Sequence, residues 1–405
     1  MNKPELLAPA GNLEKLKTAI NFGADAVYLG GNKLNLRAFA DNFTDEELKE
    51  GIEFAHSRGK KVYVTVNILP RNEDLAELKD YLIYLRDIGA DAILAADPGI
   101  IATAKEVVPD LEIHLSTQAS CINYKSALFW HNLGIKRVVM AREMSLKEYK
   151  ELREKLPKEC EIEAFVHGSM CMAYSGKCAI SNYMTGRDAN KGECAQPCRY
   201  KYTLHEEKSS GEYSKTFEDS NGEFIMNSKD LCMIEHIPEL FDSGITSFKI
   251  EGRMKSVFYA ASAVKAYREA IDSYFENPKE YVFNPKWMEY LLRPSHRIYS
   301  TGFYFDEKIK QSYESSSYIR NYDIVGIVRD YNNELKIATI EQRNKVYNGD
   351  TIEILTPKGD NKIVKIKDMK NKEGKSIESA PSAQMIFTIY CDEELNIGDL
   401  LIKSL

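Results

Sequence analysis

The first 275 residues alternate between short apolar runs and amphipathic stretches, and this rhythm constrains the fold more than any other feature. Eight runs have the length and composition of buried strands, and a helical pattern lies between most of them. They are Glu5–Ala8, Ala26–Leu29, Val62–Val66, Ala92–Ala95, Glu112–Ser116, Arg137–Met140, Glu161–Val166 and Thr246–Ile250. Repeated strand-then-helix units imply a parallel sheet with right-handed crossovers. We therefore predict an α/β fold with a TIM-like (β/α)8 barrel, and an open doubly wound sheet is the second choice.

Capping residues mark the ends of the predicted helices. Asn12 is placed to cap the first helix, and Thr44 with Glu47 forms a capping box before the second. Glycines stand where several of the following helices should end, as a left-handed cap requires. These glycines are Gly23, Gly59, Gly89 and Gly134.

A gap of about 80 residues interrupts the rhythm between the seventh strand, ending near Val166, and the eighth, starting near Thr246. We predict an insertion over about residues 167–226, which includes a polar hairpin from Lys201 to Asp219. It follows the end of a barrel strand, where barrels carry their chemistry. The barrel domain should span residues 1–275.

After a linking segment at 276–317, the hydrophobic period changes to two over residues 318–405. Turn residues such as Asn348-Gly349-Asp350 separate the runs. The predicted strands are Tyr322–Arg329, Leu335–Ile340, Thr351–Leu355, Lys362–Asp368, Met385–Cys391 and Leu400–Ile402. We expect a small antiparallel β-barrel or sandwich.

Cysteine usage and the lack of targeting segments indicate the compartment. The chain has no apolar run long enough for a signal peptide or a membrane span, so we expect a cytoplasmic protein without membrane contact. Thiols stay reduced there, and eight cysteines then indicate metal binding or catalysis rather than disulfides. A net charge of −7 does not indicate a nucleic-acid binder, although a local basic patch would suffice for one.

Four of the eight cysteines fall within the insertion, with the spacing Cys171-x6-Cys178-x15-Cys194-x3-Cys198. Thiolates are soft ligands that suit an iron–sulfur cluster or zinc. Structural zinc usually begins with a tight Cys-x2-4-Cys pair, and only the second pair here is that close. We favour a cluster, with zinc as the runner-up. Buried cysteines that act as apolar fillers are a third interpretation, which the surrounding glycines disfavour.

Polar residues follow most of the predicted strands. They are Arg37, Asn67, Asp97, Gln118, Arg142, Glu143, His167, Lys249, Glu251 and Arg253. Four are cations, which would together favour a ligand with carboxylates or phosphates. His167 could transfer a proton, bind a ligand or be a satisfied structural histidine. The alternative for the whole set is ordinary ion pairing, with Glu143 and Glu251 neutralising the arginines.

The insertion is locally basic: residues 167–202 hold five lysines and arginines against two acids, with four tyrosines between them. Cations with interleaved aromatic rings suit single-stranded RNA, whose bases stack on rings. An ordinary solvent-exposed loop could have the same composition. The chain has no Gly-x-Ser-x-Gly elbow, His-Glu-x-x-His, P-loop or dinucleotide fingerprint.

Several long segments resemble one known family. They are Glu5–Gly11, Glu163–Ser181, Gln196–Tyr200, Asn227–Leu231 and Phe248–Arg253. Together with the C-terminal β-domain they are similar to the collagenase-like peptidase family of unknown catalytic type, the thirty-second U family. The likeness extends over nearly the whole chain.

The resemblance implies more than the residues do alone. Members of the family resemble oxygen-independent hydroxylases with a [4Fe–4S] cluster, and the four clustered cysteines would be its ligands. The chain looks most like the branch that converts the wobble uridine of a tRNA anticodon loop to 5-hydroxyuridine and needs prephenate, a small dicarboxylate.

The roles of individual side chains are our inference. Arg37, Arg142 and Arg253 would hold the dicarboxylate, with Gln118 and Asn67 also contacting substrate. His167, Glu251 or Lys249 would serve catalysis.

Other functions stay open at this point. The chain could be a peptidase, as the family name says, or an RNA-binding protein with structural zinc. It could also be a hydroxylase of ribosomal RNA or of a quinone. A homo-oligomer or a paralogous partner chain is also compatible with the sequence.

Overall fold

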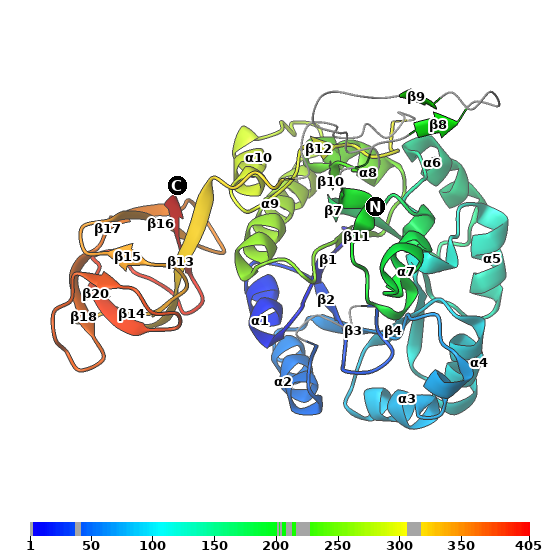
Figure 1. Ribbon diagram of the computed structural model, residues 1–405, viewed down its shortest axis with the longest axis horizontal. Coiled ribbons are helices and arrows are strands. Elements are labelled where there is room, and N and C mark those ends of the chain that lie inside the picture. Colours follow the sequence, from blue (N-terminus) through cyan, green and yellow to red (C-terminus); the bar gives the residue numbers. More distant parts are fainter. Residues whose placement is uncertain are drawn as a thin grey trace.

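The computed structural model describes residues 3–36, 42–200, 202, 205–207, 213–215, 227–305 and 317–405. Its centre is a barrel of eight parallel strands with helices around it (Figure 1). The strands are β1 (Glu5–Pro9), β2 (Ala26–Leu29), β3 (Lys61–Thr65), β4 (Ala92–Ala95), β5 (Glu112–Leu115), β6 (Arg137–Val139), β7 (Glu161–Ser169) and β11 (Ser247–Ile250). The barrel is closed because β11 pairs with β1 on one side and with β7 on the other. The predicted TIM-like barrel is confirmed, and the open doubly wound sheet is wrong.

The strands read as continuous apolar runs because both of their faces are buried. In β3, for example, Val62, Tyr63 and Val64 are all inaccessible although successive side chains point to opposite faces. One face packs under the helices and the other fills the barrel interior.

Several of the outer helices begin at a residue whose side chain caps them. They are α1 (Leu13–Asn21), α2 (Asp45–His56), α3 (Leu78–Asp87), α4 (Pro98–Val107), α5 (Tyr124–Asn132), α6 (Leu146–Lys155), α8 (Ile237–Asp242) and α9 (Val257–Glu276), with short 3-10 turns η1 (Asn72–Leu75), η2 (Thr117–Ala119) and η6 (Ile234–His236). The side chain of Asn12 accepts from Lys15 N, and the Thr44–Glu47 capping box is present. The predicted helix-end glycines all have positive φ.

Two short strands that the sequence did not indicate extend the sheet beyond the end of β7. β7 continues to Ser169, and β10 (Asp230–Cys232) pairs with its end in the antiparallel sense. β12 (Tyr299–Ser300) then pairs with β10. Strands of two or three residues carry no detectable period in the sequence, which is why they were missed.

The insertion leaves the end of β7 and consists of short turns. It contains η3 (Tyr174–Gly176), α7 (Ile180–Thr185), η4 (Ala189–Lys191) and η5 (Pro197–Arg199). The predicted hairpin is present in part as the antiparallel pair β8 (His205–Glu207) and β9 (Tyr213–Lys215).

The C-terminal part is an antiparallel half-barrel with seven strands in its main sheet, reached through α10 (Pro285–Leu292). Its elements are β13 (Tyr322–Asn332), β14 (Ile337–Gln342), β15 (Val346–Tyr347), β16 (Thr351–Leu355), β17 (Lys362–Lys365), β18 (Lys367–Asn371), β19 (Ser379–Ala380), β20 (Ile386–Tyr390) and β21 (Leu400–Ser404). The single strand predicted at Lys362–Asp368 is two strands, β17 and β18, which lie at opposite edges of that sheet. The two strands are separated by Ile366, whose N–H donates to Asp350 O.

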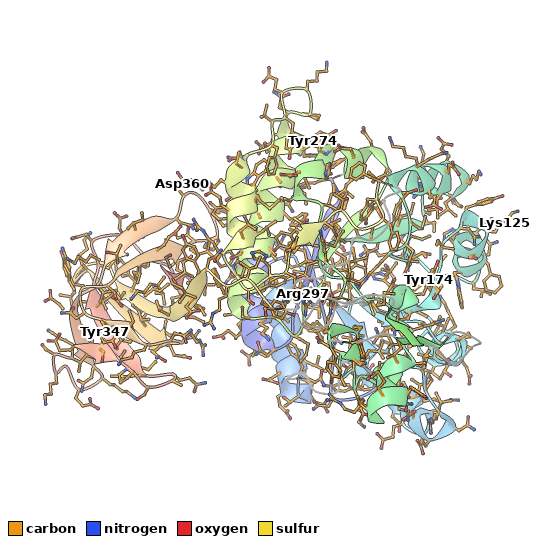
Figure 2. All side chains as sticks on the ribbon, turned by 45° about the horizontal axis from the view of Figure 1, so that its top comes forward. Lys125, Tyr174, Tyr274, Arg297, Tyr347 and Asp360 are labelled. Atoms are coloured by element: carbon orange, nitrogen blue, oxygen red, sulfur yellow. The ribbon has the colours of Figure 1, made fainter. Side chains whose placement is uncertain are left out.

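The half-barrel packs against α9, α10 and α1. Ile327 and Leu400 join the apolar core of the barrel, and Lys286 pairs with Asp360. Figure 2 shows Asp360 on the side of the half-barrel nearer the barrel and Tyr347 on the side away from it. Within the described residues, no helix combines the length and apolar character that a bilayer crossing requires.

Candidate functional site: a lumen pocket beside a cysteine cavity

Most of the predicted rim residues meet in one cavity of about 100 Å3 at the ends of the barrel strands, which we call the lumen pocket. Its polar and aromatic lining includes Tyr28, Thr65, Asn67, Gln118, Arg142, Phe165, Lys249, Glu251 and Arg253. The ends of parallel strands converge there, so residues far apart in sequence become neighbours. Arg37 lies outside the described residues.

Arg142 and Glu251 form one wall of the lumen pocket. Arg142 Nη1 donates to Ser169 O at 2.9 Å, and its Nη2 lies 3.4 Å from Glu251 Oε2. The guanidinium stacks over the Phe165 ring at 4.0 Å. Tyr28 Oη donates to Ile250 O at 3.0 Å and lies 3.4 Å from Glu251 Oε2. Glu251 therefore pairs with an arginine, as the alternative of ordinary ion pairing would have it, and the pair faces a cavity.

Arg253 and Gln118 complete the polar lining. Arg253 Nη1 donates to Thr65 Oγ1 at 3.0 Å, and its Nη2 to Asn35 Oδ1 at 3.5 Å. Asn67 Oδ1 accepts from the N–H of Leu36 at 3.4 Å. Among the described residues, buried Gln118 Oε1 and Arg142 Nε have no hydrogen-bond partner. An unpaired acceptor and an unpaired donor beside one cavity are expected where a polar ligand binds.

Beneath the pocket, a buried ionic network fills the barrel interior. Lys249 Nζ lies 2.6 Å from Glu163 Oε1, and Arg137 Nη1 lies 3.1 Å from Glu163 Oε2. Arg137 also pairs with Glu5 and Glu161. Lys249 and Arg137 hold the pKa of the Glu163 carboxyl below its usual value although burial opposes them. The sequence analysis did not single out Glu163. The signal that could have found it is a charged residue inside an apolar strand.

The four clustered cysteines line a second cavity of about 410 Å3, which we call the cysteine cavity. Cys171 follows β7, Cys178 precedes α7, Cys194 follows η4 and Cys198 lies in η5. The turns between them depend on left-handed glycines such as Gly192, with φ of 96°.

The two cavities are adjacent. Arg142 and Glu251 line both of them. Lys255, which the sequence did not single out, also lines the cysteine cavity, and burial lowers its pKa to about 8. Arg199 ties the insertion to the barrel by donating to Met170 O and Asn227 Oδ1 at 2.9 and 2.7 Å.

The arrangement of the thiols bears on what they could hold. Among the described residues, no three His, Cys, Asp or Glu side chains are placed to hold a single metal ion. A zinc ion needs four ligands that converge at about 2.3 Å from one point. In a cluster, each thiolate binds a different iron, so the sulfurs surround a volume. Burial raises the pKa of Cys171 and Cys198, so metal binding would have to displace their protons.

His167 is separated from the other candidates. Its ring is 1% exposed and packs against the rings of Tyr259, Tyr267 and Tyr299 at centroid distances of 5.3–5.8 Å. Burial lowers the pKa of His167 to about 3. Among the described residues, no histidine lines either cavity. His167 is thus remote from both cavities, and among the described residues its buried Nδ1 has no hydrogen-bond partner.

Comparison with known proteins gives matches over nearly the whole chain. The model of peptidase family U32 matches residues 11–314, and that of the peptidase family U32 C-terminal domain matches residues 320–401. The tRNA hydroxylation protein P1 of Bacillus subtilis (strain 168) is 42% identical over 407 residues, which cover 99% of this chain and 95% of that protein. The tRNA hydroxylation protein P of Escherichia coli (strain K12) is 37% identical, with 99% and 97% covered. A collagenase of Porphyromonas gingivalis (strain ATCC BAA-308 / W83) is 32% identical, with 100% and 98% covered.

Proposed function

The chain belongs to peptidase family U32, and from that premise we propose that it is an enzyme of tRNA hydroxylation. Its reaction would convert the wobble uridine of a tRNA anticodon loop to 5-hydroxyuridine without dioxygen. The observation that carries this proposal is likeness to two tRNA hydroxylation proteins over 99% of the chain. The alternative substrates, ribosomal RNA and a quinone, gain no comparable support.

A [4Fe–4S] cluster fits the cysteine cavity better than zinc does. The four thiols surround a volume, and the adjoining Arg142 side chain would offset the negative charge of a thiolate-ligated cluster. When bound to Cys171, Cys178, Cys194 and Cys198, the cluster would supply the redox chemistry of the reaction.

The lumen pocket suits prephenate as the co-substrate. Arg142 and Arg253 lie in the same pocket, and a dicarboxylate needs cations of this kind. Glu251, on the wall shared by the two cavities, is the carboxylate placed to move a proton between a ligand in either cavity and Tyr28.

The surface of the insertion suits an unstacked RNA loop. Tyr174, Tyr183 and Tyr200 are exposed there, and Tyr183 is 92% accessible. Exposed rings next to cations stack single-stranded bases. To bring C5 of a uridine to the cavities, the enzyme has to take the base out of its stack. The exposed rings would hold its neighbours while it enters.

The peptidase alternative is less compatible with the geometry. A cysteine peptidase needs a histidine beside its nucleophilic thiol. His167, the histidine nearest in sequence to Cys171, instead faces three tyrosine rings.

The proposal is tested by nucleoside analysis of tRNA from cells that lack the gene and carry variants of it. We expect 5-hydroxyuridine to disappear on deletion, to return with the wild-type gene, and to stay absent with Arg142→Ala, whose protein should keep its iron. Arg86→Ala is the matched control, because Arg86 forms an exposed ion pair with Asp87. Normal 5-hydroxyuridine in the deletion strain would overturn the proposed function.

A further inference from the structure

Lys249 combines burial with access to a cavity. Its side chain is 4% exposed, and its Nζ lies 4.5 Å from the centroid of the Tyr28 ring and 5.3 Å from that of Phe165. The same residue lines the lumen pocket. A purely structural ion pair would not need to border a cavity, so the position of this amine calls for a chemical explanation.

The surroundings of Lys249 are those of a nucleophilic amine. A lysine becomes nucleophilic when it is desolvated and a base can take its proton. Burial lowers the pKa of Lys249. Glu163 Oε1 lies 2.6 Å from Nζ, and Arg137 helps to keep that carboxylate ionised, so a proton acceptor is in contact with the amine.

The other groups of the pocket define the class of ligand. Arg142 and Arg253 suit a carboxylate, and among the described residues Arg142 Nε and Gln118 Oε1 have unused hydrogen-bonding capacity. A nucleophilic amine suits a carbonyl carbon. A carboxylate with an adjacent carbonyl is a 2-oxo acid, and the small volume of the pocket restricts the entering group to a narrow end of that kind.

We propose that Lys249 Nζ captures a 2-oxo acid in the lumen pocket as a reversible imine. Prephenate carries a 2-oxo acid side chain, so for the identity of the natural ligand this inference rests on the proposed function. The covalent bond would fix the ligand beside the wall that the lumen pocket shares with the cysteine cavity.

The step is balanced without any oxidant or reductant. Glu163 first takes a proton from the Lys249 ammonium, and the neutral amine then attacks the keto carbon and forms a C–N bond. The keto oxygen receives one proton from the nitrogen and the one held by Glu163, and leaves as water when the C=N bond forms, which gives a protonated imine beside the Glu163 carboxylate. Addition of water reverses the sequence and releases the 2-oxo acid unchanged.

The test is reductive trapping on the full-length protein with its cysteine site loaded. The protein is incubated with pyruvate as the 2-oxo acid probe and with sodium cyanoborohydride, and the modified peptides are mapped by mass spectrometry. We expect one carboxyethyl group on Lys249, with saturation as pyruvate is raised, and none with lactate, which lacks the carbonyl.

Two variants and one control variant identify the groups involved. Lys249→Arg should lose the label, whereas Lys255→Arg, the matched control from the cysteine cavity, should keep it. Glu163→Gln should slow trapping by roughly a hundredfold, the contribution expected of a positioned proton acceptor. If a variant fails to fold, the labelled peptides of the wild-type protein still show whether Lys249 is the modified residue.

The outcomes separate this inference from the proposed function because the assay contains no RNA. Lysines labelled at random, or an unlabelled Lys249 in a protein that hydroxylates tRNA, would overturn the imine alone. A labelled Lys249 in a protein whose deletion leaves tRNA nucleosides unchanged would overturn the proposed function and leave the imine standing.

Discussion

The lumen pocket and the cysteine cavity share Arg142 and Glu251, yet they are built from different kinds of structure. The lumen pocket is lined by strands of the closed barrel, which contribute Tyr28, Thr65, Phe165 and Lys249, and by the loops that directly follow strands, which contribute Asn67, Arg142, Glu251 and Arg253. Each barrel strand is fixed by two neighbours. Short 3-10 turns and the six-residue α7 hold the thiols. The side-chain ties of the turns include Ser175 to Glu143 and Asn190 to Cys178.

The two cavities should therefore be stabilised by different interactions. The barrel strands fix the lumen pocket before any ligand binds, because strand pairing and the buried ionic network are complete without one. The cysteine cavity has little apolar packing of its own, so the group that the thiols bind should contribute much of its stability. Changes in the two regions should therefore have separable effects.

The largest expected effect is the loss of the bound metal. Cys194→Ala should abolish bound iron, sulfide and tRNA hydroxylation while the barrel stays folded, because Cys194 is exposed and outside the barrel core. Metal analysis, the visible spectrum and thermal unfolding measure these effects. Cys391→Ala, in the half-barrel, is the matched control and should keep its iron. One zinc and no sulfide in the wild type would contradict the cluster.

A substitution in the buried ionic network should destabilise the barrel without changing the metal content of the cysteine site. Arg137→Met leaves the carboxylates of half-buried Glu5 and fully buried Glu163 without a cation that contacts both, and should lower the free energy of unfolding by ~3–5 kcal/mol. Urea unfolding measures the loss, and the iron content per folded chain should be unchanged. Arg86→Met, from an exposed pair that water screens, should cost far less. A similar cost for both variants would show that the network contributes no special stability.

Substitutions on the exposed surface of the insertion should change the affinity for RNA and nothing else. Tyr183→Ala should weaken tRNA binding by ~1–3 kcal/mol, the contribution of one stacked base, and leave thermal unfolding unchanged. Tyr347→Ala, an exposed tyrosine on the side of the half-barrel away from the barrel, is the control (Figure 2). Equal losses in the two variants, measured by filter binding at fixed salt, would argue against a docking role for the insertion.

Near neutral pH the smallest expected effect is a pH dependence from His167, which lines neither cavity. Burial lowers its pKa from an ordinary 6.5 to about 3, so below pH 6.5 the unfolded chain takes up a proton that the folded chain does not. The free energy of unfolding should therefore fall, by roughly 1.4 kcal/mol per pH unit, as pH decreases from 6.5 toward 3. His167→Phe should show a shallower decrease in unfolding experiments across this range. An unchanged slope would mean that His167 is already charged in the folded protein.

Much of this architecture could be predicted because its signals are local. The strand Ala26–Leu29 was predicted to the residue, and the Thr44–Glu47 capping box formed as expected. Lys362–Asp368 was predicted wrongly as one strand, because strand propensity does not register that its first half pairs with β16 and its second half with β20. Glu163 was missed as a site residue for a related reason: its role depends on Lys249 and Arg137, which are distant in sequence.

The sequence by itself determined the barrel rhythm, the helix caps and the four clustered cysteines, since each depends on residues within a few turns of chain. Only the tertiary structure decided that Arg142 and Glu251 border two cavities, that His167 faces tyrosines, and that Lys249 lies against a buried carboxylate. Closing the barrel brings strand ends together from positions tens to hundreds of residues apart. Which side chains then meet depends on register and burial, and neither is encoded in a local pattern.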